Sequence, residues 1–184
     1  MNFNNHWNLE GTHAPFSASH SSWLSYSDDK LLSVFHNLKA KERGTRLHEW
    51  AKETILLGIK QSRSNKTICA YVNDAIGFKM QPEVVLRYSD YFFGTADAIS
   101  FKNGMLRIHD LKTGKSGHME QLYVYAALFC LEYDVKPGDI TIECRLYIED
   151  TVEVERPTAE VIVPIMDKIV YFNELLEKEA KKGA

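Results

Sequence analysis

The sequence predicts a mixed α/β (α+β) fold in which a central mixed sheet is flanked by helices. Two observations support this class. Apolar residues follow a helical period before residue 80 and the alternation of strands after it. The helical period returns near residue 118, so helices and strands alternate within one chain. With 184 residues, 45% of them hydrophobic and 26% charged, the chain fits a single globular domain over residues 1–184.

The part of the chain before residue 80 is expected to be helical. Residues 1–18 contain Gly11, Pro15 and many polar residues, and they are predicted to form an irregular arm. One or two short helices are expected over 17–38, because serines stand at the N-cap positions. A longer helix is predicted over 38–61 and a short one over 65–78.

Three consecutive strands are predicted over 80–88, 91–101 and 105–112. Asn103 and Gly104 join the second and third, and Asn-Gly is the strongest hairpin signal because a type I′ turn needs positive φ at both positions. A helix over 118–135 and a strand over 139–150 follow. The last predicted element is a C-terminal helix over 158–182, which Pro164 is expected to disturb.

The Asn-Gly turn fixes the register of its hairpin. If Lys102 pairs with Met105, Asp97 lies opposite Asp110, with Cβ atoms about 5 Å apart. Side chains alternate between the two faces of a strand, so both aspartates share the apolar face of the hairpin with Lys112. Two opposed carboxylates destabilise a sheet unless a positive charge lies between them.

A divalent cation is the simplest such charge, because Mg²⁺ and Mn²⁺ prefer carboxylate and water oxygens. Beside the metal, Lys112 would position or help to deprotonate an attacking water, or stabilise the charge on a phosphoryl oxygen. The alternative is that Lys112 only neutralises the two aspartates in an ion network at the sheet edge.

Gly114, Lys115 and Ser116 look like the end of a phosphate-binding P-loop. Such a loop needs a glycine five residues before Gly114, and His109 stands there instead. Nucleotide binding is therefore the weakest of the functional alternatives. His109 itself is expected on the face of the hairpin opposite the aspartates, and it is not a predicted ligand.

The net charge of −3 argues against a general polyanion binder, although basic residues dominate between Lys30 and Lys66. Either nucleic-acid binding or a solvated helix face explains such a run. The three cysteines are widely separated and predict neither a disulfide framework nor a metal motif. No stretch approaches the ~20 apolar residues of a membrane span, and the N-terminus lacks the layout of a signal peptide, so a cytoplasmic location is expected.

Several of these residues together resemble the PD-(D/E)xK nuclease superfamily. The pattern comprises Gly94 to Asp97, Asp110 to Gly114, and Gln121 with Tyr125 on the following helix. It is closest to the RecB-like branch, which includes CRISPR-associated and phage exonucleases, and it covers roughly residues 41–147. The resemblance implies a restriction-endonuclease-like αβββαβ core and a metal-dependent DNA nuclease. The expected kind is an exonuclease of phage or mobile-element type.

The resemblance also implies a metal shell. From the residues alone, His48 shares an apolar helix face with Ala51 and Ile55 and would be a core histidine. RecB-like nucleases place a ligand in the pattern G-x-x-x-H-E, here ending in His48 and Glu49. The implied ligands of one or two Mg²⁺ or Mn²⁺ ions are His48, Asp97, Asp110 and the backbone carbonyl of Leu111. Glu83 is a further candidate, and a plain surface glutamate is the alternative for it.

Gln121 and Tyr125 lie one helical turn apart and would align the DNA strand, with Gln121 also joining Asp97, Asp110 and Lys112 in catalysis. An amphipathic seam is the other explanation of Tyr125. Thr113 and Lys115 would contact phosphates of the DNA, although a solvated Lys115 fits equally.

Three further expectations concern cofactors and partners. Family members with an iron-sulfur cluster carry one cysteine before the core and three clustered after it, a pattern that this chain lacks, so no cluster is expected. Related phage exonucleases form rings around DNA, which leaves a homo-oligomer open. The alternative function is a catalytically inactive DNA-binding or assembly subunit with the nuclease fold.

Overall fold

The computed structural model describes residues 5–182 except 10, 13, 63 and 115. Contacts divide the chain into two compact units, Met1–Thr45 and Arg46–Ala184. Helix α1 (Asp28–Leu56) begins in the first unit and ends in the second. Two short 3-10 helices, η1 (Trp7–Leu9) and η2 (Ala18–Ser25), precede it, so η1 interrupts the predicted irregular arm. None of the described helices has the length and apolar character needed to cross a membrane.

Helix α1 is continuous where the sequence predicted a boundary between two helices near Leu38. That prediction was wrong because serines mark helix starts, but no proline or glycine stops the helix before Gly44. The intervening residues are mostly strong helix formers such as leucine, lysine and glutamate. Gly44 lies inside the helix and lowers its propensity without ending it.

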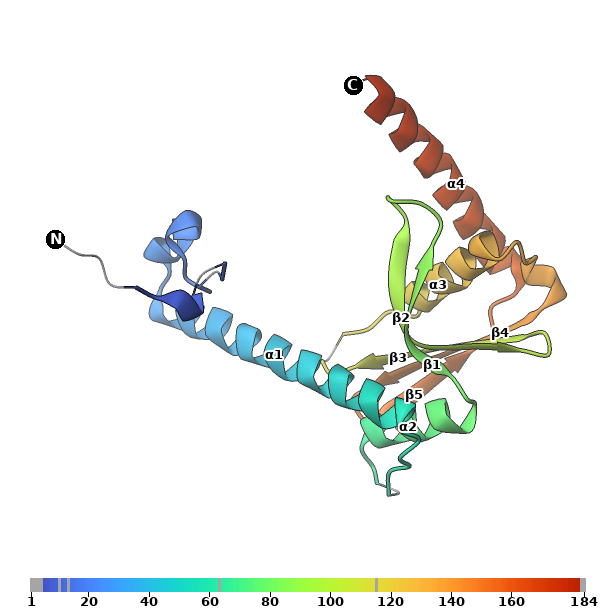
Figure 1. Ribbon diagram of the computed structural model, residues 1–184, viewed down its shortest axis with the longest axis horizontal. Helices are drawn as coiled ribbons and strands as arrows, with labels where there is room; N and C mark the ends of the chain where they lie inside the picture. Colours follow the sequence, from blue (N-terminus) through green and yellow to red (C-terminus); the bar gives the residue numbers. More distant parts are fainter. Residues whose placement is uncertain (1–4, 10, 13, 63, 115, 183–184) are drawn as a thin grey trace. The chain divides into compact units, whose positions relative to one another are not determined.

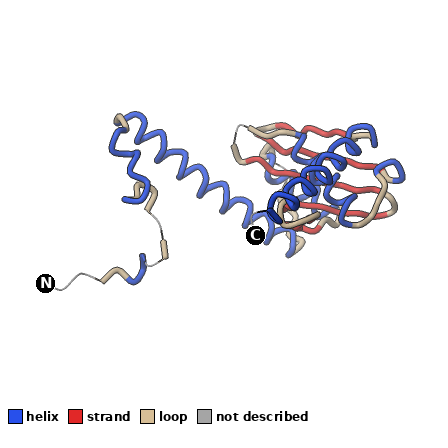
Figure 2. Tube along the Cα trace, turned by 90° about the horizontal axis from the view of Figure 1, so that it is seen from above, coloured by secondary structure: helices blue, strands red, loops and turns tan. Residues whose placement is uncertain are grey.

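The second unit is built on a five-stranded mixed sheet (Figures 1 and 2). Its strands lie side by side in chain order, and they are β1 (Gln81–Arg87), β2 (Phe93–Lys102), β3 (Met105–Lys112), β4 (Thr141–Ile148) and β5 (Thr151–Glu155). All neighbours are antiparallel except β3 and β4, which are parallel. A parallel pair needs a crossover, which α3 (Met119–Glu132) supplies. The predicted mixed sheet flanked by helices is confirmed, and the order from α2 (Thr67–Gly77) to β4 is consistent with an αβββαβ core.

The hairpin of β2 and β3 has the predicted register. Lys102 pairs with Met105, and the pairing continues in step towards the aspartates. Asn103 and Gly104 have φ values of 52° and 73°, as a type I′ turn requires. The registered pair farthest from the turn is Ala98 with His109. Asp97 is the next residue of β2, one position beyond the registered pairs.

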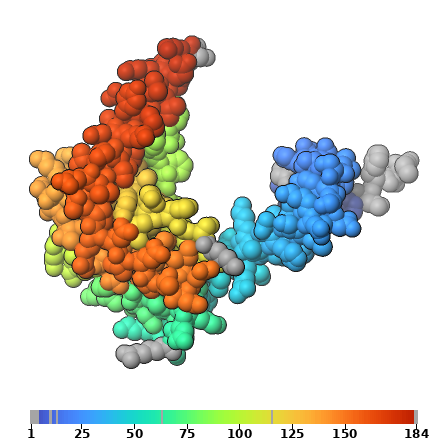
Figure 3. All heavy atoms as spheres, turned by 180° about the vertical axis from the view of Figure 1, so that it is seen from behind, coloured from blue at the N-terminus to red at the C-terminus, as the bar shows by residue number. Residues whose placement is uncertain are grey.

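Helices cover both faces of the sheet in the second unit. On one face, α3 buries Leu106 and Ile108 beneath Leu122. Helix α4 (Ala159–Lys182) packs on the outside of α3 (Figure 3). On the other face, α2 and the end of α1 cover Ala98 and Leu111. Both faces of the hairpin are therefore buried, and polar residues on either face need partners.

The sequence missed β5. The predicted strand over 139–150 is β4 alone, preceded by a 3-10 turn, η3 (Pro137–Asp139). The chain reverses at Glu149, whose φ is 50°, and returns as Thr-Val-Glu-Val-Glu, whose alternation is itself a strand signal. Pro164 lies inside α4 without ending it, although its missing amide hydrogen removes the hydrogen bond to the Glu160 carbonyl.

A buried glutamate joins the sheet to α2. Glu143 is 2% exposed, and its carboxylate lies 2.6 Å from Arg156 Nη2, 3.0 Å from Arg145 Nη2 and 3.5 Å from Arg107 Nε. Arg145 also pairs with Asp74 of α2 at 3.0 Å. Burial pushes the pKa of Glu143 up, but the hydrogen bonds and charges of Arg156 and Arg145 outweigh it and lower this pKa overall. The cluster is thus a structural set of charges, in which Arg145 and Arg156 hydrogen-bond the carboxylate and Arg107 contributes its charge alone.

We predict that Glu143→Gln lowers the free energy of unfolding by about 3 kcal/mol near neutral pH, because three guanidinium groups lose their buried partner. The lowered pKa of Glu143 means that its contribution is present above the ordinary value of 4.5 and is lost as the pH falls through the folded-state value. Urea unfolding near pH 7 and near pH 3 measures both effects. Glu153→Gln on the exposed strand β5 is the control. Equal stability of the two variants near pH 7 would contradict the prediction.

Candidate metal centre

Three carboxylates lie at the same level of neighbouring strands. The registered pairs on either side of Glu83 and Asp97 place these two residues opposite each other across β1 and β2. Between β2 and β3 the register ends at Ala98 and His109, and Asp97 and Asp110 are the next residues of the two strands. They lie close enough for the charge of Asp110 to raise the pKa of Asp97. We call Glu83, Asp97 and Asp110 the acidic row. Its central member, Asp97, is flanked by a carboxylate on each side.

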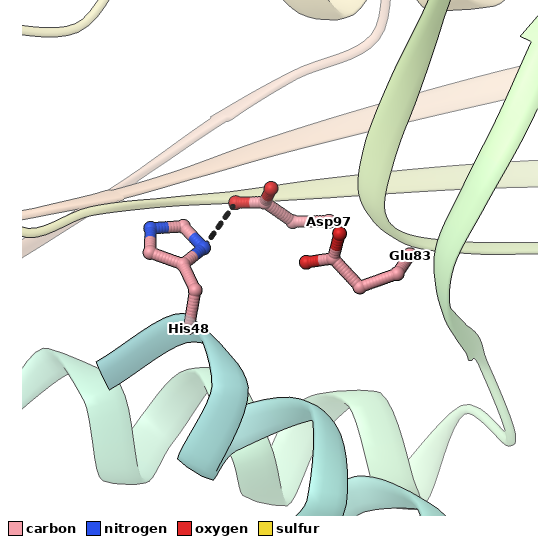
Figure 4. A group of neighbouring side chains, drawn as sticks. All are labelled: His48, Glu83 and Asp97. Carbon is pink, nitrogen blue, oxygen red and sulfur yellow. Dashed lines mark ion pairs between the residues drawn. The ribbon is translucent and has the colours of Figure 1, made fainter. Parts of the chain in front are cut away.

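Glu83 departs from regular strand geometry. Its φ of 54° lies in the left-handed region, which is uncommon for a residue other than glycine. Such a conformation costs about 1–3 kcal/mol and persists only where the surroundings impose it. The side chain is half-buried and its carboxylate points towards His48 and Asp97 (Figure 4). The structure therefore places Glu83 in the site, not on the open surface.

His48 reaches the acidic row from α1 (Figure 4). Its Nδ1 lies 3.5 Å from Asp97 Oδ2. Ala51 and Ile55, one and two turns further on, are buried in the core, so this face of the helix points inward as predicted. One ligand atom each from His48, Glu83 and Asp97 lie within 4.8 Å of one another. This group could hold a metal ion.

The Asp97 carboxylate lies in an environment that disfavours its negative charge. Burial, followed by the charge of Asp110, raises its pKa to about 6, and Glu83 adds to the rise. The Leu111 amide donates a hydrogen bond to Asp97 Oδ2 at 2.8 Å and acts in the opposite direction, as does His48. Burial and the two neighbouring carboxylates together outweigh these contacts, so the Asp97 carboxylate binds a proton more readily than usual. A cation placed between these groups would relieve the same repulsion.

Asp110 has a different partner from the other two acids. Lys112 Nζ lies 2.8 Å from Asp110 Oδ2 and donates to Gln121 Oε1 at 2.7 Å. Gln121 Nε2 in turn donates to the Tyr125 hydroxyl at 3.0 Å. We call this chain of four residues the lysine row. It confirms that Gln121 and Tyr125 of α3 share one face, and it joins them to β3.

The contacts of the lysine row leave fewer candidate metal ligands than the sequence predicted. Lys112 neutralises Asp110 alone, and the closest potential ligands are His48, Glu83 and Asp97. Asp110 Oδ2 is buried, and the Lys112 ammonium pairs with it at 2.8 Å without meeting hydrogen-bond geometry. Asp110 therefore already has a cationic partner, and an ion held by the other three residues would lie beside it. Leu111 contacts Asp97 through its amide, and the role of its carbonyl stays a prediction.

The remaining predicted residues lie around this core or outside it. Thr113 is exposed just after β3, where a phosphate contact stays a prediction. Lys115 lies outside the described residues. His109 lies on the opposite face, with Nδ1 3.2 Å from the Tyr147 hydroxyl. Burial and then the charge of Arg145 lower the pKa of His109 to about 3, so the ring is neutral.

Sequence reasoning missed Tyr71 of α2. Its ring is buried and packs edge-on against Tyr147, with centroids 5.3 Å apart. Burial raises the pKa of Tyr71, and the charges of all three acids of the acidic row raise it further, with Asp97 first. The phenol therefore stays protonated beside the site. No spacing in residues 65–78 distinguishes this tyrosine from a core residue, so only the fold identifies it.

We predict that Asp97→Asn stabilises the metal-free protein near pH 7.5 by about 1–3 kcal/mol. The pKa of Asp97 is raised in the folded state, so stability is lost as the pH rises from the ordinary value of 3.8 to about 6. Asparagine carries no charge at this position, so the variant does not lose this stability as the pH rises. Urea unfolding in EDTA near pH 7.5 and near pH 4 measures it, and the gain should shrink at the lower pH.

Asp90→Asn is the matched control, because Asp90 is exposed and pairs only with Arg87. Added Mn²⁺ should raise the unfolding midpoint of the wild type and of the control, but much less that of Asp97→Asn, because a ligand stabilises only the state that binds it. A metal-free Asp97→Asn protein no more stable than the wild type near pH 7.5 would show that the charge of Asp97 does not destabilise the fold.

Two comparisons with known proteins bear on the identity of the chain. A scan against protein-family models finds no match. A search of curated proteins finds no match either. The function of this protein therefore has to be inferred from the geometry of the site.

Proposed function

We propose that this protein is a metal-dependent DNA nuclease that hydrolyses phosphodiester bonds, and that it acts as an exonuclease of phage or mobile-element type. The observation that carries the proposal is the acidic row with Lys112 beside it. Carboxylates that need a cation stand next to a lysine whose ammonium is already held in place. This combination suits phosphoryl transfer, in which charge builds up on non-bridging and leaving oxygens.

The donor atoms suit Mg²⁺ or Mn²⁺. Carboxylate oxygens dominate the site, and His48 adds one imidazole nitrogen. Hard divalent cations prefer oxygen ligands, and Mn²⁺ also accepts imidazole. His48, Glu83 and Asp97 would hold the ion, with Asp110 beside it. When bound, the ion would polarise a phosphoryl oxygen and lower the pKa of a bound water.

The lysine row supplies the other groups that hydrolysis needs. The Lys112 ammonium donates hydrogen bonds and would hold the attacking water or stabilise a phosphoryl oxygen as negative charge develops. Water attacks phosphorus in line, the bond to the bridging oxygen breaks, and that oxygen takes a proton. Gln121 and Tyr125 continue the row along α3 and would align the strand beside Lys112.

DNA as the substrate is favoured by the charges near the site. Arg46 is exposed on α1, two residues before His48. Thr113 is exposed at the end of β3, next to Lys112. The protein as a whole has a net charge of −3, so phosphate contacts would be local to these elements and weaken with added salt.

We predict that Asp110→Ala and Lys112→Ala each reduce DNA hydrolysis by about 100-fold or more. Lys112 stabilises the negative charge that develops in the transition state, and Asp110 holds the Lys112 ammonium and lies beside the proposed ion. Duplex and single-stranded DNA carrying a label at one end, with free or blocked 5′ and 3′ ends, is incubated with Mg²⁺ or Mn²⁺. Digestion that starts only from free ends identifies an exonuclease and its polarity.

Lys102→Ala, in the exposed hairpin turn, is the control for the loss of a positive charge. Calorimetric titration with Mn²⁺ separates the proposal from an inactive subunit. The wild type and Lys112→Ala should both bind the ion, because Lys112 is not a ligand. A wild type that neither binds Mn²⁺ nor cuts DNA would identify the inactive alternative, and full activity of either site variant would refute the proposed roles.

A further inference from the structure

The lysine row depends on side chains that are long and flexible. Lys112 has four rotatable bonds, and its ammonium keeps two contacts, 2.8 Å to Asp110 and 2.7 Å to Gln121. Such a side chain loses rotamer freedom when it is held in one place. Something other than its two polar partners must therefore guide the aliphatic stem.

Gly117 provides that guide. A Cβ atom built on Gly117 would lie 2.8 Å from Lys112 Cγ, a separation too short for real atoms, and 3.3 Å from both Leu146 Cδ1 and Ile148 Cδ1. The stem of Lys112 thus runs across the bare backbone of Gly117, with two side chains of β4 closing the remaining space. Gly117 is not among the glycines with positive φ, so close approach, not backbone conformation, requires glycine here.

Gly94 does the same at the other end of the lysine row. A Cβ atom on Gly94 would lie 3.0 Å from Tyr125 Cε1. Gly94 also lacks positive φ. The Tyr125 ring occupies the space that a side chain at position 94 would need. Two members of the row, Lys112 and Tyr125, therefore lie against glycine backbone.

We infer that Gly117 and Gly94 are positioning residues, which hold the Lys112 ammonium and the Tyr125 hydroxyl where the proposed hydrolysis uses them. A methyl group at 117 must displace the stem of Lys112, because Leu146 is buried and cannot yield. A shift of about 1 Å breaks a hydrogen bond of 2.7 Å, and misplacement of that size costs about 100-fold in rate. The consequence for rate rests on the proposed function, whereas the placement of the ammonium does not.

The test compares Gly117→Ala with Gly138→Ala, a control whose new methyl group would meet only Ala159 Cβ at an ordinary 3.9 Å. The rate at which an amine-reactive acylating reagent modifies Lys112, measured by peptide mass spectrometry, reports whether the ammonium is held. We expect modification to become about tenfold faster in Gly117→Ala and to stay unchanged in Gly138→Ala. Nuclease kcat should fall about 100-fold with little change in KM, because DNA binding is preserved.

Ile148→Val removes the Cδ1 atom that lies 3.3 Å from the new methyl group at position 117, which gives that methyl group room to move away from Lys112. Combined with Gly117→Ala, it should return the modification rate towards that of the wild type, which a general loss of stability would not do. A folded Gly117→Ala protein with wild-type modification and cleavage rates overturns the inference, as does a double variant without rescue. Faster modification in a protein whose wild type does not cut DNA supports the positioning role and refutes the nuclease.

If Gly117→Ala does not fold, Gly94→Ala carries the same measurement. Its new methyl group meets only the edge of the Tyr125 ring, and the disturbance passes to Lys112 through Gln121. We expect modification of Lys112 about threefold faster than in the wild type. An unchanged rate in folded Gly94→Ala overturns the inference.

Discussion

Repulsion among three carboxylates is the constraint around which the site is arranged. Glu83, Asp97 and Asp110 occupy one level of three adjacent strands, and like charges directly opposite each other destabilise a sheet. Two of the three have partners that oppose the repulsion: Asp110 has the Lys112 ammonium, and Asp97 has the Leu111 amide and His48. These contacts do not offset burial and the neighbouring carboxylates at Asp97, whose pKa is raised to about 6.

The contrast with Glu143 shows why the remaining repulsion is informative. Glu143 is as deeply buried as Asp110, but three arginines surround it and its pKa is lowered. A buried charge with a purely structural role is typically paired with opposite charges in this way. At a binding site the opposite charge comes from the ligand, so the charge is left unpaired in the free protein. The two clusters lie in one sheet, so general burial does not account for the difference between them.

Much of this arrangement could be predicted from local sequence signals. Asn103 and Gly104 set the hairpin register, and counting back from the turn along both strands brings Asp97 next to Asp110. The spacing of Gln121 and Tyr125 predicted that they share one face of a helix, and their hydrogen bond confirms it. These predictions succeeded because turn chemistry and strand alternation act over a few residues.

What the sequence could not predict depends on contacts between distant segments. Glu143 meets Arg107 across 36 positions, and Tyr71 meets the acidic row only because α2 covers that face of the sheet. The close approach of side chains to Gly94 in β2 and to Gly117 in the following loop becomes visible only in the folded structure. Strand β5 is the exception, since its alternation was visible and was overlooked.

The position of α3 decides how firmly the site is held. Only the residues between Lys112 and Met119 connect β3 to this helix, and so short a connection leaves little freedom in where the helix starts. Beyond that start, Leu122 and Ala126 are fully buried against the sheet. Gln121 therefore moves only if the core moves. The hydrogen bonds of the lysine row span β3 and α3. Hydrophobic packing fixes the distance between these two elements, because a close-packed core permits only small displacements.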